Sequence, residues 1–350
     1  MTIAVNTNIT KSGFTIVAAD TGFRFPCEPD ESVLDAAQRA GLEMPFSCRK
    51  GVCGTCKGGL VCGEVRAFRG DALSADERNS GQVLFCNTRP RSDLIIAPRT
   101  ISKADPFARR TVVARVFRLQ RLSSDIMEVH LRFPAGIRVG FKAGQHLSLI
   151  LDNGERRDFS MANSPRENDG ALLHIRHVPG GEFTGHVFEH LKRGDLLRVQ
   201  LPFGDFTLRE SDKPILFVAA STGFAPIRSI IEDALAKGIN RDMTLYWGAR
   251  HRGRLYSDLP SRWAKQHSHF RYVPIMFDQQ AEGAHPNLIY RAVLEDHPSL
   301  AGFQVYLCGV ATMTHAARAA FLAAGLPDNE CFSDTFVTRG DLALSGQTNR

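Results

Sequence analysis

The stretch Cys48-Arg49-Lys50-Gly51-Val52-Cys53-Gly54-Thr55-Cys56 decides how the rest of the chain is interpreted, and a fourth cysteine, Cys86, follows after 29 further residues. Three cysteines in one tight loop and a fourth at a distance, spaced C-x4-C-x2-C…C, match the ligand spacing of a [2Fe–2S] cluster. Glycine at positions 51 and 54 lets the loop turn without Cβ clashes and direct backbone N–H groups at the sulfur atoms. The sequence therefore predicts four iron ligands: Cys48, Cys53, Cys56 and Cys86.

A four-thiolate zinc site and unpaired thiols are the alternatives for these cysteines. Structural zinc sites more often pair two short C-x2-4-C knuckles, and one short pair is present here. Three of the other cysteines, Cys27, Cys62 and Cys331, lie in or beside apolar runs and are expected to be small buried side chains. Eight cysteines in 350 residues are too few for a disulfide scaffold and suit a reducing compartment.

Size and charge narrow the class of protein. A chain of 350 residues with 43% hydrophobic content can bury several cores, so several domains are expected. The first residues lack a basic segment followed by an apolar one, and the longest apolar run, residues 215–220, is too short to span a bilayer. We expect a cytoplasmic protein that binds no membrane. The net charge of +6 is dispersed, which argues against nucleic acid and fits a solvated surface, or else a preference for anionic cofactors or an acidic partner.

Residues 11–98 are predicted to form a small domain of strands and one helix. Two short strands are expected at 14–17 and 23–26, followed by a helix that Ser32 caps and that stops at Gly41. The cysteine loop comes next, and further strands place Cys86 at a strand end. Element order and cysteine spacing together resemble a plant-type ferredoxin domain, which implies a β-grasp fold. Residues 99–111, with a proline, several charges and no clear period, are expected to be a linker.

Short strands with Gly, Pro and Asn between them predict an antiparallel β-barrel at 112–209. Within it, Arg157-Asp-Phe-Ser160 is similar to the flavin-binding R-x-Y-S motif of the ferredoxin–NADP reductase superfamily. The resemblance implies that Arg157 pairs with the flavin pyrophosphate, Phe159 packs on the isoalloxazine ring, and Ser160 hydrogen-bonds near the reactive flavin nitrogen. Phenylalanine stands at 159 where tyrosine is usual, so ring stacking is retained and a phenolic hydrogen bond is not.

A second stretch of the barrel, His177-Val-Pro-Gly-Gly-Glu-Phe-Thr184, precedes a helix expected from Gly185. Paired glycines and a threonine at the start of a helix can present N–H groups to a phosphate, although an ordinary turn has the same composition. Its position twenty residues after Arg157 resembles the family's second pyrophosphate contact. The residues so implied are His177, Val178, Gly180, Gly181 and Thr184.

The last domain, placed at 213–338 and followed by a polar tail at 339–350, begins with the apolar run 215–220, as expected of a buried parallel strand. Ser221-Thr-Gly-Phe-Ala-Pro226 then opens a helix and resembles the family's G-T-G-x-A-P pyridine-nucleotide loop, with serine in place of the first glycine. The resemblance implies nucleotide contacts at Thr222, Gly223 and Pro226. The overall expectation is a multidomain α+β and α/β protein with a Rossmann-like parallel sheet.

Two residue pairs and one loop complete the predicted site. Cys308 and Gly309 match the strand end that lies beside the nicotinamide in the family, which would make Cys308 catalytic together with Ser160; a buried thiol is the alternative. Asp334 and Phe336 match the family's C-terminal acidic and aromatic pair near the flavin, with plain core packing as the alternative for Phe336. The loop that begins at Arg250 contains three arginines and no acid through residue 254, which favours NADPH over NADH unless it is only a solvated loop.

The three modules in this order resemble the reductase component of Rieske aromatic-ring-hydroxylating dioxygenases of the terephthalate type. The resemblance implies a monomer that contains FAD, rather than FMN, and a [2Fe–2S] cluster. It also implies that two electrons pass as hydride from NAD(P)H to the flavin and then singly through the cluster to the Rieske centre of a terminal oxygenase. Two alternatives stay open. One is the reductase of a deoxysugar dehydrase or of a diiron hydroxylase, and the other is a redox-sensing or electron-storage flavoprotein.

Overall fold

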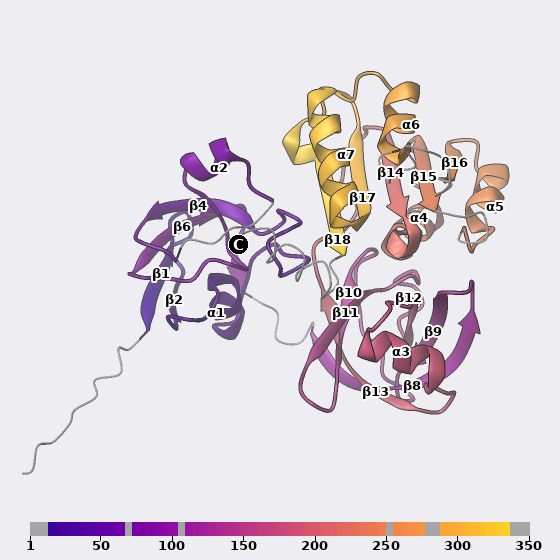
Figure 1. Cartoon of the computed structure of the whole chain (residues 1–350), viewed down its shortest axis with the longest axis horizontal. Helices are drawn as coiled ribbons and strands as arrows, with labels where there is room; N and C mark the ends of the chain where they lie inside the picture. The colour runs from indigo at the N-terminus through magenta and orange to yellow at the C-terminus, as the bar shows by residue number, and fades with distance from the viewer. Residues whose placement is uncertain (1–12, 67–71, 104–108, 250–254, 277–287, 337–350) are drawn as a thin grey trace, which may run out of the picture. The chain divides into compact units, whose positions relative to one another are not determined.

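The computed structural model describes residues 13–66, 72–103, 109–249, 255–276 and 288–336 (Figure 1). The chain divides into two compact units, with the boundary between residues 105 and 106. The second unit contains two sheets, one antiparallel and one parallel. Within the described ranges, no helix is long and apolar enough to cross a membrane.

The first unit is built on a five-stranded mixed sheet in the order β2-β1-β6-β4-β5. Its main strands are β1 (Phe14–Ala18), β2 (Arg24–Cys27), β4 (Lys57–Cys62), β5 (Gln82–Leu84) and β6 (Leu94–Pro98). A separate short pair joins β3 (Leu42–Glu43) to β7 (Ser102–Lys103), and the helices are α1 (Val33–Arg39) and α2 (Ala75–Asn79). The central strand β6 runs parallel to β1 and antiparallel to β4, so it joins the two hairpins of the sheet.

Helix α1 forms where the sequence predicts it. The Ser32 side chain caps the helix by accepting the Asp35 N–H at 3.1 Å, and Gly41 follows the helix with a φ of +72°. Leu34 and Ala37 are completely buried, so the apolar stripe of the helix packs into the core of this unit. The stretch expected as a linker, 99–111, contributes Ser102–Lys103 to β7 and its last two residues to β8.

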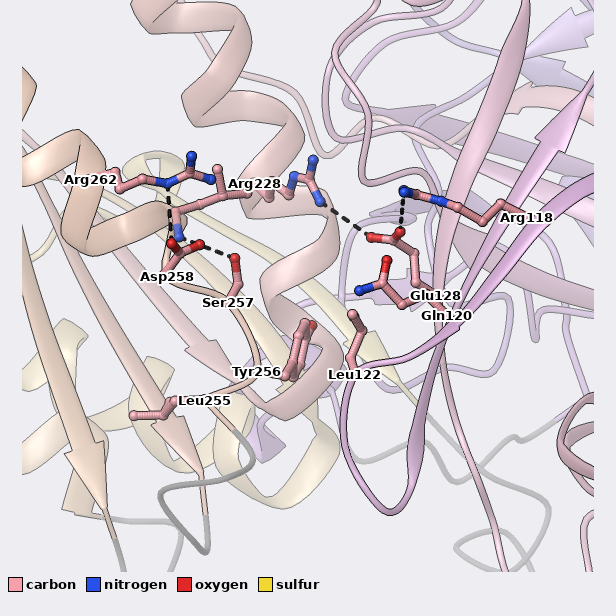
Figure 2. A pocket seen from close by; sticks show the side chains of 11 residues that line it. Arg118, Gln120, Leu122, Glu128, Arg228, Leu255, Tyr256, Ser257, Asp258 and Arg262 are labelled. Carbon is pink, nitrogen blue, oxygen red and sulfur yellow. Dashed lines mark hydrogen bonds and ion pairs between the residues drawn. The ribbon is translucent and has the colours of Figure 1, made fainter.

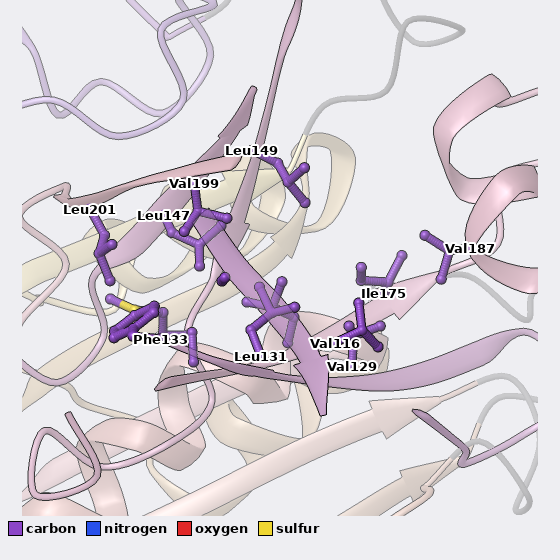
Figure 3. Packing of buried hydrophobic residues seen from close by; sticks show 14 of the residues in the cluster. Val116, Val129, Leu131, Phe133, Leu147, Leu149, Ile175, Val187, Val199 and Leu201 are labelled. Carbon is purple, nitrogen blue, oxygen red and sulfur yellow. The ribbon is translucent and has the colours of Figure 1, made fainter. Parts of the chain in front are cut away.

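The antiparallel sheet of the second unit has the order β11-β10-β13-β8-β9-β12. Its strands are β8 (Arg110–Arg121), β9 (Ile126–Arg132), β10 (His146–Ile150), β11 (Arg156–Ser160), β12 (Gly170–Arg176) and β13 (Leu196–Phe203), with one helix, α3 (Glu182–Glu189). A bridge between Met161 and Leu173 joins the end of β11 to β12 and closes the sheet into a barrel. Side chains such as Val116, Val129 and Leu147 fill the interior (Figure 3). Helix α3 begins three residues earlier than the sequence suggests, because Gly181 is already its N-cap.

The parallel sheet has the order β16-β15-β14-β17-β18. Its strands are β14 (Ile215–Ala220), β15 (Met243–Ala249), β16 (Phe270–Met276), β17 (Gln304–Val310) and β18 (Cys331–Phe336). The helices are α4 (Phe224–Ala236), α5 (Leu259–Gln266), α6 (Leu288–Asp296) and α7 (Ala311–Ala323), with short 3-10 turns at Ser221–Gly223 and Asp328–Glu330. Helices α4 and α5 pack with one set of strand side chains, including Phe217, and α6 and α7 pack with the alternate set, including Val218. This doubly covered sheet, the barrel and the N-terminal mixed sheet confirm the predicted fold class.

Inside the second unit, α4 connects the parallel sheet to the barrel. The Ser229 hydroxyl donates to the carbonyl of Asn163 at 2.6 Å, and both side chains are buried. A Cβ at Gly144 would lie 2.0 Å from the carbonyl oxygen of Phe206, so only glycine allows the backbone at residue 144 to lie this close to Phe206. The edge of the parallel sheet where its strands end is therefore held against the barrel.

Candidate active site

The four predicted cluster ligands lie in the first unit, on the loop between β3 and β4 and directly after β5. Cys53, Cys56 and Cys86 are buried, and Cys48 is partly exposed. Gly51 and Gly54 have φ values of +74° and +72°, which bears out the expectation that glycine is required at both turns. The Cys48 sulfur accepts backbone hydrogen bonds, including one from Lys50 N–H at 3.4 Å. The backbone of the loop therefore directs N–H groups at the Cys48 sulfur.

The thiols associate in two pairs. A hydrogen bond with Cys53 lowers the pKa of the Cys48 thiol to about 6, and a hydrogen bond with Cys86 lowers the pKa of Cys56. Among the residues that the structure describes, no group of three or more His, Cys, Asp or Glu side chains could hold a single metal ion. Two pairs of thiolates suit two iron atoms with two protein ligands each, and they suit a single tetrahedral zinc ion poorly.

Arg49 stabilises the cluster loop from within. Its φ is +54°, an uncommon conformation for a non-glycine residue. The guanidinium pairs with Asp35 at 2.8 Å, hydrogen-bonds to Gln38, and lies 4.5 Å from the centroid of the Phe46 ring. These contacts tie the loop to helix α1 and offset the backbone strain.

The flavin-motif residues lie on β11 of the barrel. Arg157 is partly buried and pairs with Glu155, and Phe159 packs beside Phe183 of α3 with a centroid separation of 5.7 Å. Ser160, at the end of the strand, is buried and donates to Asp334 at 3.1 Å. An arginine, an aromatic face and a hydroxyl spaced along one strand fit the pyrophosphate, the ring and the reactive edge of a flavin.

The glycine-rich turn that follows β12 is shaped by Thr184. The Thr184 hydroxyl accepts the Val178 N–H at 3.1 Å and lies within hydrogen-bonding distance of the Gly181 carbonyl at 3.2 Å. Gly180 has a φ of +73°, and a Cβ at Gly181 would lie 2.6 Å from the threonine oxygen. The turn leads into the N-terminus of α3, where unpaired N–H groups favour a phosphate. His177 lies just before the turn, with its ring 5.3 Å from that of Phe188 on α3.

Residues from three strands meet where the barrel contacts the parallel sheet. Cys308 on β17 is the register partner of Asp334 on β18, and Asp334 accepts the Ser160 hydrogen bond from β11. Cys308 and Asp334 are both buried. Burial, with a smaller contribution from Asp334, raises the pKa of the Cys308 thiol well above its usual range. The thiol therefore keeps its proton at neutral pH and acts as an apolar or weakly donating group.

The nucleotide loop adjoins these residues. Ser221 has a φ of +51°, and its carbonyl accepts the Trp247 indole N–H at 3.0 Å. A Cβ at Gly223 would lie 2.2 Å from the Cys308 carbonyl oxygen, so glycine is required where this loop passes β17. Thr222 is buried beside it, and Pro226 lies in the first turn of α4. This loop and the Cys308-Gly309 strand end lie at the crevice between β14 and β17, where the strand order reverses and nucleotides bind in such sheets.

A pocket of about 640 Å³, which no sequence motif predicts, lies between the barrel, α4 and the start of α5 (Figure 2). Glu128 on β9 pairs with Arg118 at 2.8 Å and lies 3.8 Å from Arg228 on α4. Burial favours the neutral form of Glu128, but His174 and the two arginines outweigh it and lower the pKa of the carboxyl. His174 is fully enclosed, and its Nδ1 lies 3.0 Å from the Tyr256 hydroxyl. These contacts join the barrel to the loop that precedes α5.

The structure brings most of the predicted site residues into three groups. The cluster ligands form one group, and the Gly180-Gly181 turn forms another. The third contains Ser160, Cys308, Gly309, Asp334 and the Thr222-Gly223 loop. Phe336, the register partner of Val310, packs partly buried against the core of the parallel sheet. Arg250 lies outside the described residues.

Three family models match successive parts of the chain. The model of a 2Fe-2S iron-sulfur cluster binding domain matches residues 16–91, that of an oxidoreductase FAD-binding domain matches 114–208, and that of an oxidoreductase NAD-binding domain matches 217–319. The fold and these matches define an NAD(P)H-dependent oxidoreductase that contains FAD and a [2Fe–2S] cluster.

Several known reductases align with nearly the whole chain. Reductase component 1 of terephthalate 1,2-dioxygenase from Comamonas sp. is 40% identical over 325 residues, which cover 91% of this chain and 96% of the relative. A CDP-6-deoxy-L-threo-D-glycero-4-hexulose-3-dehydrase reductase from Yersinia pestis is 35% identical over 319 residues, with coverage of 91% and 96%. The crystal structure of the cytochrome P450 reductase GcoB from Amycolatopsis superposes with a TM-score of 0.73 at 32% identity, covering 93% of this chain and 99% of that one.

The chain belongs to the ferredoxin–NADP reductase superfamily, in the family of reductases with an N-terminal [2Fe–2S] ferredoxin domain that includes the terephthalate 1,2-dioxygenase reductase components. The predicted class of enzyme and its cofactors are confirmed.

Proposed function

We propose that this protein delivers electrons from NADPH to the Rieske centre of a terminal oxygenase that hydroxylates an aromatic acid. The observation that carries the proposal is the 40% identity to terephthalate 1,2-dioxygenase reductase components, which extends through all three modules. Redox potentials favour this direction, because plant-type clusters have potentials near roughly −400 mV and Rieske centres have higher ones, from about −150 mV upward.

The residues that meet at the barrel are proposed to act on the reacting atoms. A bound flavin would supply the chemistry that links two-electron hydride transfer to one-electron transfer. Ser160 would hold a hydrogen bond at the flavin, and Asp334, already bonded to the serine at 3.1 Å, would orient its hydroxyl. Neutral, buried Cys308 would pack beside the nicotinamide without introducing charge. Because all three side chains are buried, they would also keep water from the reacting atoms.

The ends of the cofactors would be held by the outer residues of the site. Arg157 would exchange its ion pair with Glu155 for the flavin pyrophosphate, and the turn of Gly180, Gly181 and Thr184 would provide the second phosphate contact. The loop of Thr222 and Gly223 would hold the nicotinamide nucleotide. The preference for NADPH remains a proposal that rests on the basic composition of residues 250–254.

Electron delivery to a deoxysugar dehydrase is the second candidate, because the Yersinia pestis dehydrase reductase aligns over the same share of the chain. Reconstitution distinguishes the two. The reductase would be combined with NADPH and either the oxygenase component of Comamonas terephthalate 1,2-dioxygenase or the Yersinia dehydrase, and product would be measured in each mixture. We expect product in the mixture that contains the oxygenase and none in the mixture that contains the dehydrase. Product with the dehydrase alone would transfer the assignment to the second candidate.

A further inference from the structure

The outer surface of the barrel around β8 presents exposed arginines and apolar side chains that serve none of the proposed cofactor contacts. We define the β8 face by the side chains of Arg115, Phe117, Arg132, Arg193, Leu196 and Arg198. Phe117 and Leu196 are 38% and 60% exposed, and neighbouring Val113 is 49% exposed. In the sheet order, β10 and β13 separate β8 from β11, which carries the flavin motif. The β8 face is therefore a feature distinct from the candidate active site.

Strand register brings like charges together on this face. Arg115 is the direct partner of Arg132 on β9 and of Leu196 on β13, so the three side chains form one row across three strands. Like charges directly opposite each other on adjacent strands destabilise a sheet. The Arg115–Arg132 pair therefore lowers the stability of the sheet, and its presence at the surface indicates that the positive charge has a function.

The Phe117 ring contacts two of the arginines. The register shifts between Val116 and Arg118, so Phe117 occupies a β-bulge, a feature that re-aims side chains. The guanidinium carbon of Arg132 lies 4.5 Å from the centroid of its ring, and that of Arg193 lies 5.7 Å away. Cations over an aromatic face hold each other in place while their outer N–H groups remain available to acceptors.

The arginines of the β8 face lack acidic partners within the part of the chain that the structure describes, whereas neighbouring Arg118 pairs with Glu128 at 2.8 Å. The nearest carboxylate in the sequence, Asp195, accepts the N–H of Lys192 at 3.0 Å in its own turn. Burial, and then Arg118 and Arg132, lower the pKa of partly buried His130 against smaller opposing effects of Glu128 and Glu167.

We propose that the β8 face docks a partner protein whose contact surface carries acidic and apolar side chains together. Four exposed arginines without carboxylate partners give the face a positive charge that complements an anionic surface. Exposed Phe117 and Leu196 beside these arginines offer apolar contact area, which a nucleic-acid backbone does not use. Arginine and aromatic residues together are enriched at the centres of protein interfaces. The proposal does not depend on which enzyme accepts the electrons.

The test uses the full-length holoprotein and a fluorescein-labelled peptide of repeating Glu-Asp-Leu-Phe, with binding followed by fluorescence anisotropy. The variant Arg115→Glu/Arg132→Glu reverses two charges of the face. Arg24→Glu/Arg291→Glu makes the same change of net charge at two exposed arginines elsewhere and serves as the matched control. NADPH-dependent ferricyanide reduction should be unchanged in both variants, which checks that each folds and holds its flavin.

We expect the β8-face variant to bind the acidic peptide weaker by on the order of 10-fold or more, and the control to bind like the wild type. Arg115→Lys/Arg132→Lys, which keeps the charge, should retain most of the affinity. No binding by the wild type at millimolar peptide, or equal affinity in all variants, would overturn the proposal. Tighter binding of a 16-base-pair DNA duplex or of phosphatidylglycerol vesicles, lost in the same variant, would also overturn it by assigning the face to another class of partner.

Discussion

Single side chains account for much of the predicted chemistry, and several already have partners in the protein alone. Ser160 is bonded to Asp334, Arg157 to Glu155, and Arg49 to Asp35. Reversing the charge of Arg49 would therefore break the contact that ties the cluster loop to α1.

At Ser160, replacement by alanine removes the hydroxyl that Asp334 orients. We expect Ser160→Ala to bind flavin normally and to slow its reduction by NADPH on the order of 10²-fold, as is typical when one donor at a reacting centre is lost. Stopped-flow absorbance of flavin bleaching measures this rate. Ser148→Ala is the control, because Ser148 is buried on adjacent β10 and its hydroxyl has no hydrogen-bond partner among the described residues. Equal rates in the two variants would remove Ser160 from the reaction.

His174 should make stability depend on pH. Burial lowers its pKa in the folded protein, against a weaker opposing effect of Glu128, whereas the unfolded chain takes up a proton near its ordinary pKa of about 6.5. The contribution is complete above that pH and is lost as pH falls below it, because the unfolded state then binds more protons. Urea unfolding at pH 7.5 and 5.5 should show wild type losing more free energy of unfolding than His174→Gln. Parallel losses would show that this histidine does not titrate as described.

At the scale of elements, the sequence predicted correctly those helices and loops whose conformation depends on neighbouring residues. Caps, glycines and cysteine spacing act over a few residues, so α1 and the cluster loop were predictable. Strand β6 was not predicted, although it is central in its sheet, because Leu94–Pro98 is a short run whose pairing with β1 depends on residues nearly eighty positions away. The Glu128–Arg228 and His174–Tyr256 contacts were missed for the same reason, since they join distant elements through tertiary packing.

The approach of the nucleotide loop to β17 gives a prediction at this scale. Gly223→Ala would place a Cβ 2.2 Å from the Cys308 carbonyl oxygen, so the loop must move. We expect a loss of about 1–3 kcal/mol in the free energy of unfolding and a raised KM for NADPH. Gly302→Ala, where a Cβ would meet nothing within 4 Å, is the control and should change neither quantity. A Gly223→Ala variant that matched this control would mean that the close approach is not required.

At the scale of the molecule, the two compact units separate the cluster from the flavin and nucleotide residues. Substitution of a cluster ligand should therefore remove cluster function without affecting hydride transfer to the flavin. Cys53→Ser is expected to lose the cluster and its reduction of cytochrome c while keeping flavin absorbance and ferricyanide reduction. The expectation that Cys62 is buried was wrong, because the residue is exposed on β4, and Cys62→Ser should keep all four properties. Loss of ferricyanide reduction along with the cluster would show that the units depend on each other.

An anaerobic titration with NADPH, and separately with NADH, shows whether electrons pass through the flavin to the cluster when visible absorption and electron paramagnetic resonance are followed together. We expect the flavin absorbance to bleach and the rhombic signal of a reduced [2Fe–2S] cluster to grow during the same titration, faster with NADPH. A reduced flavin without any cluster signal would rule out this electron path, because electrons would then not reach Cys48, Cys53, Cys56 and Cys86.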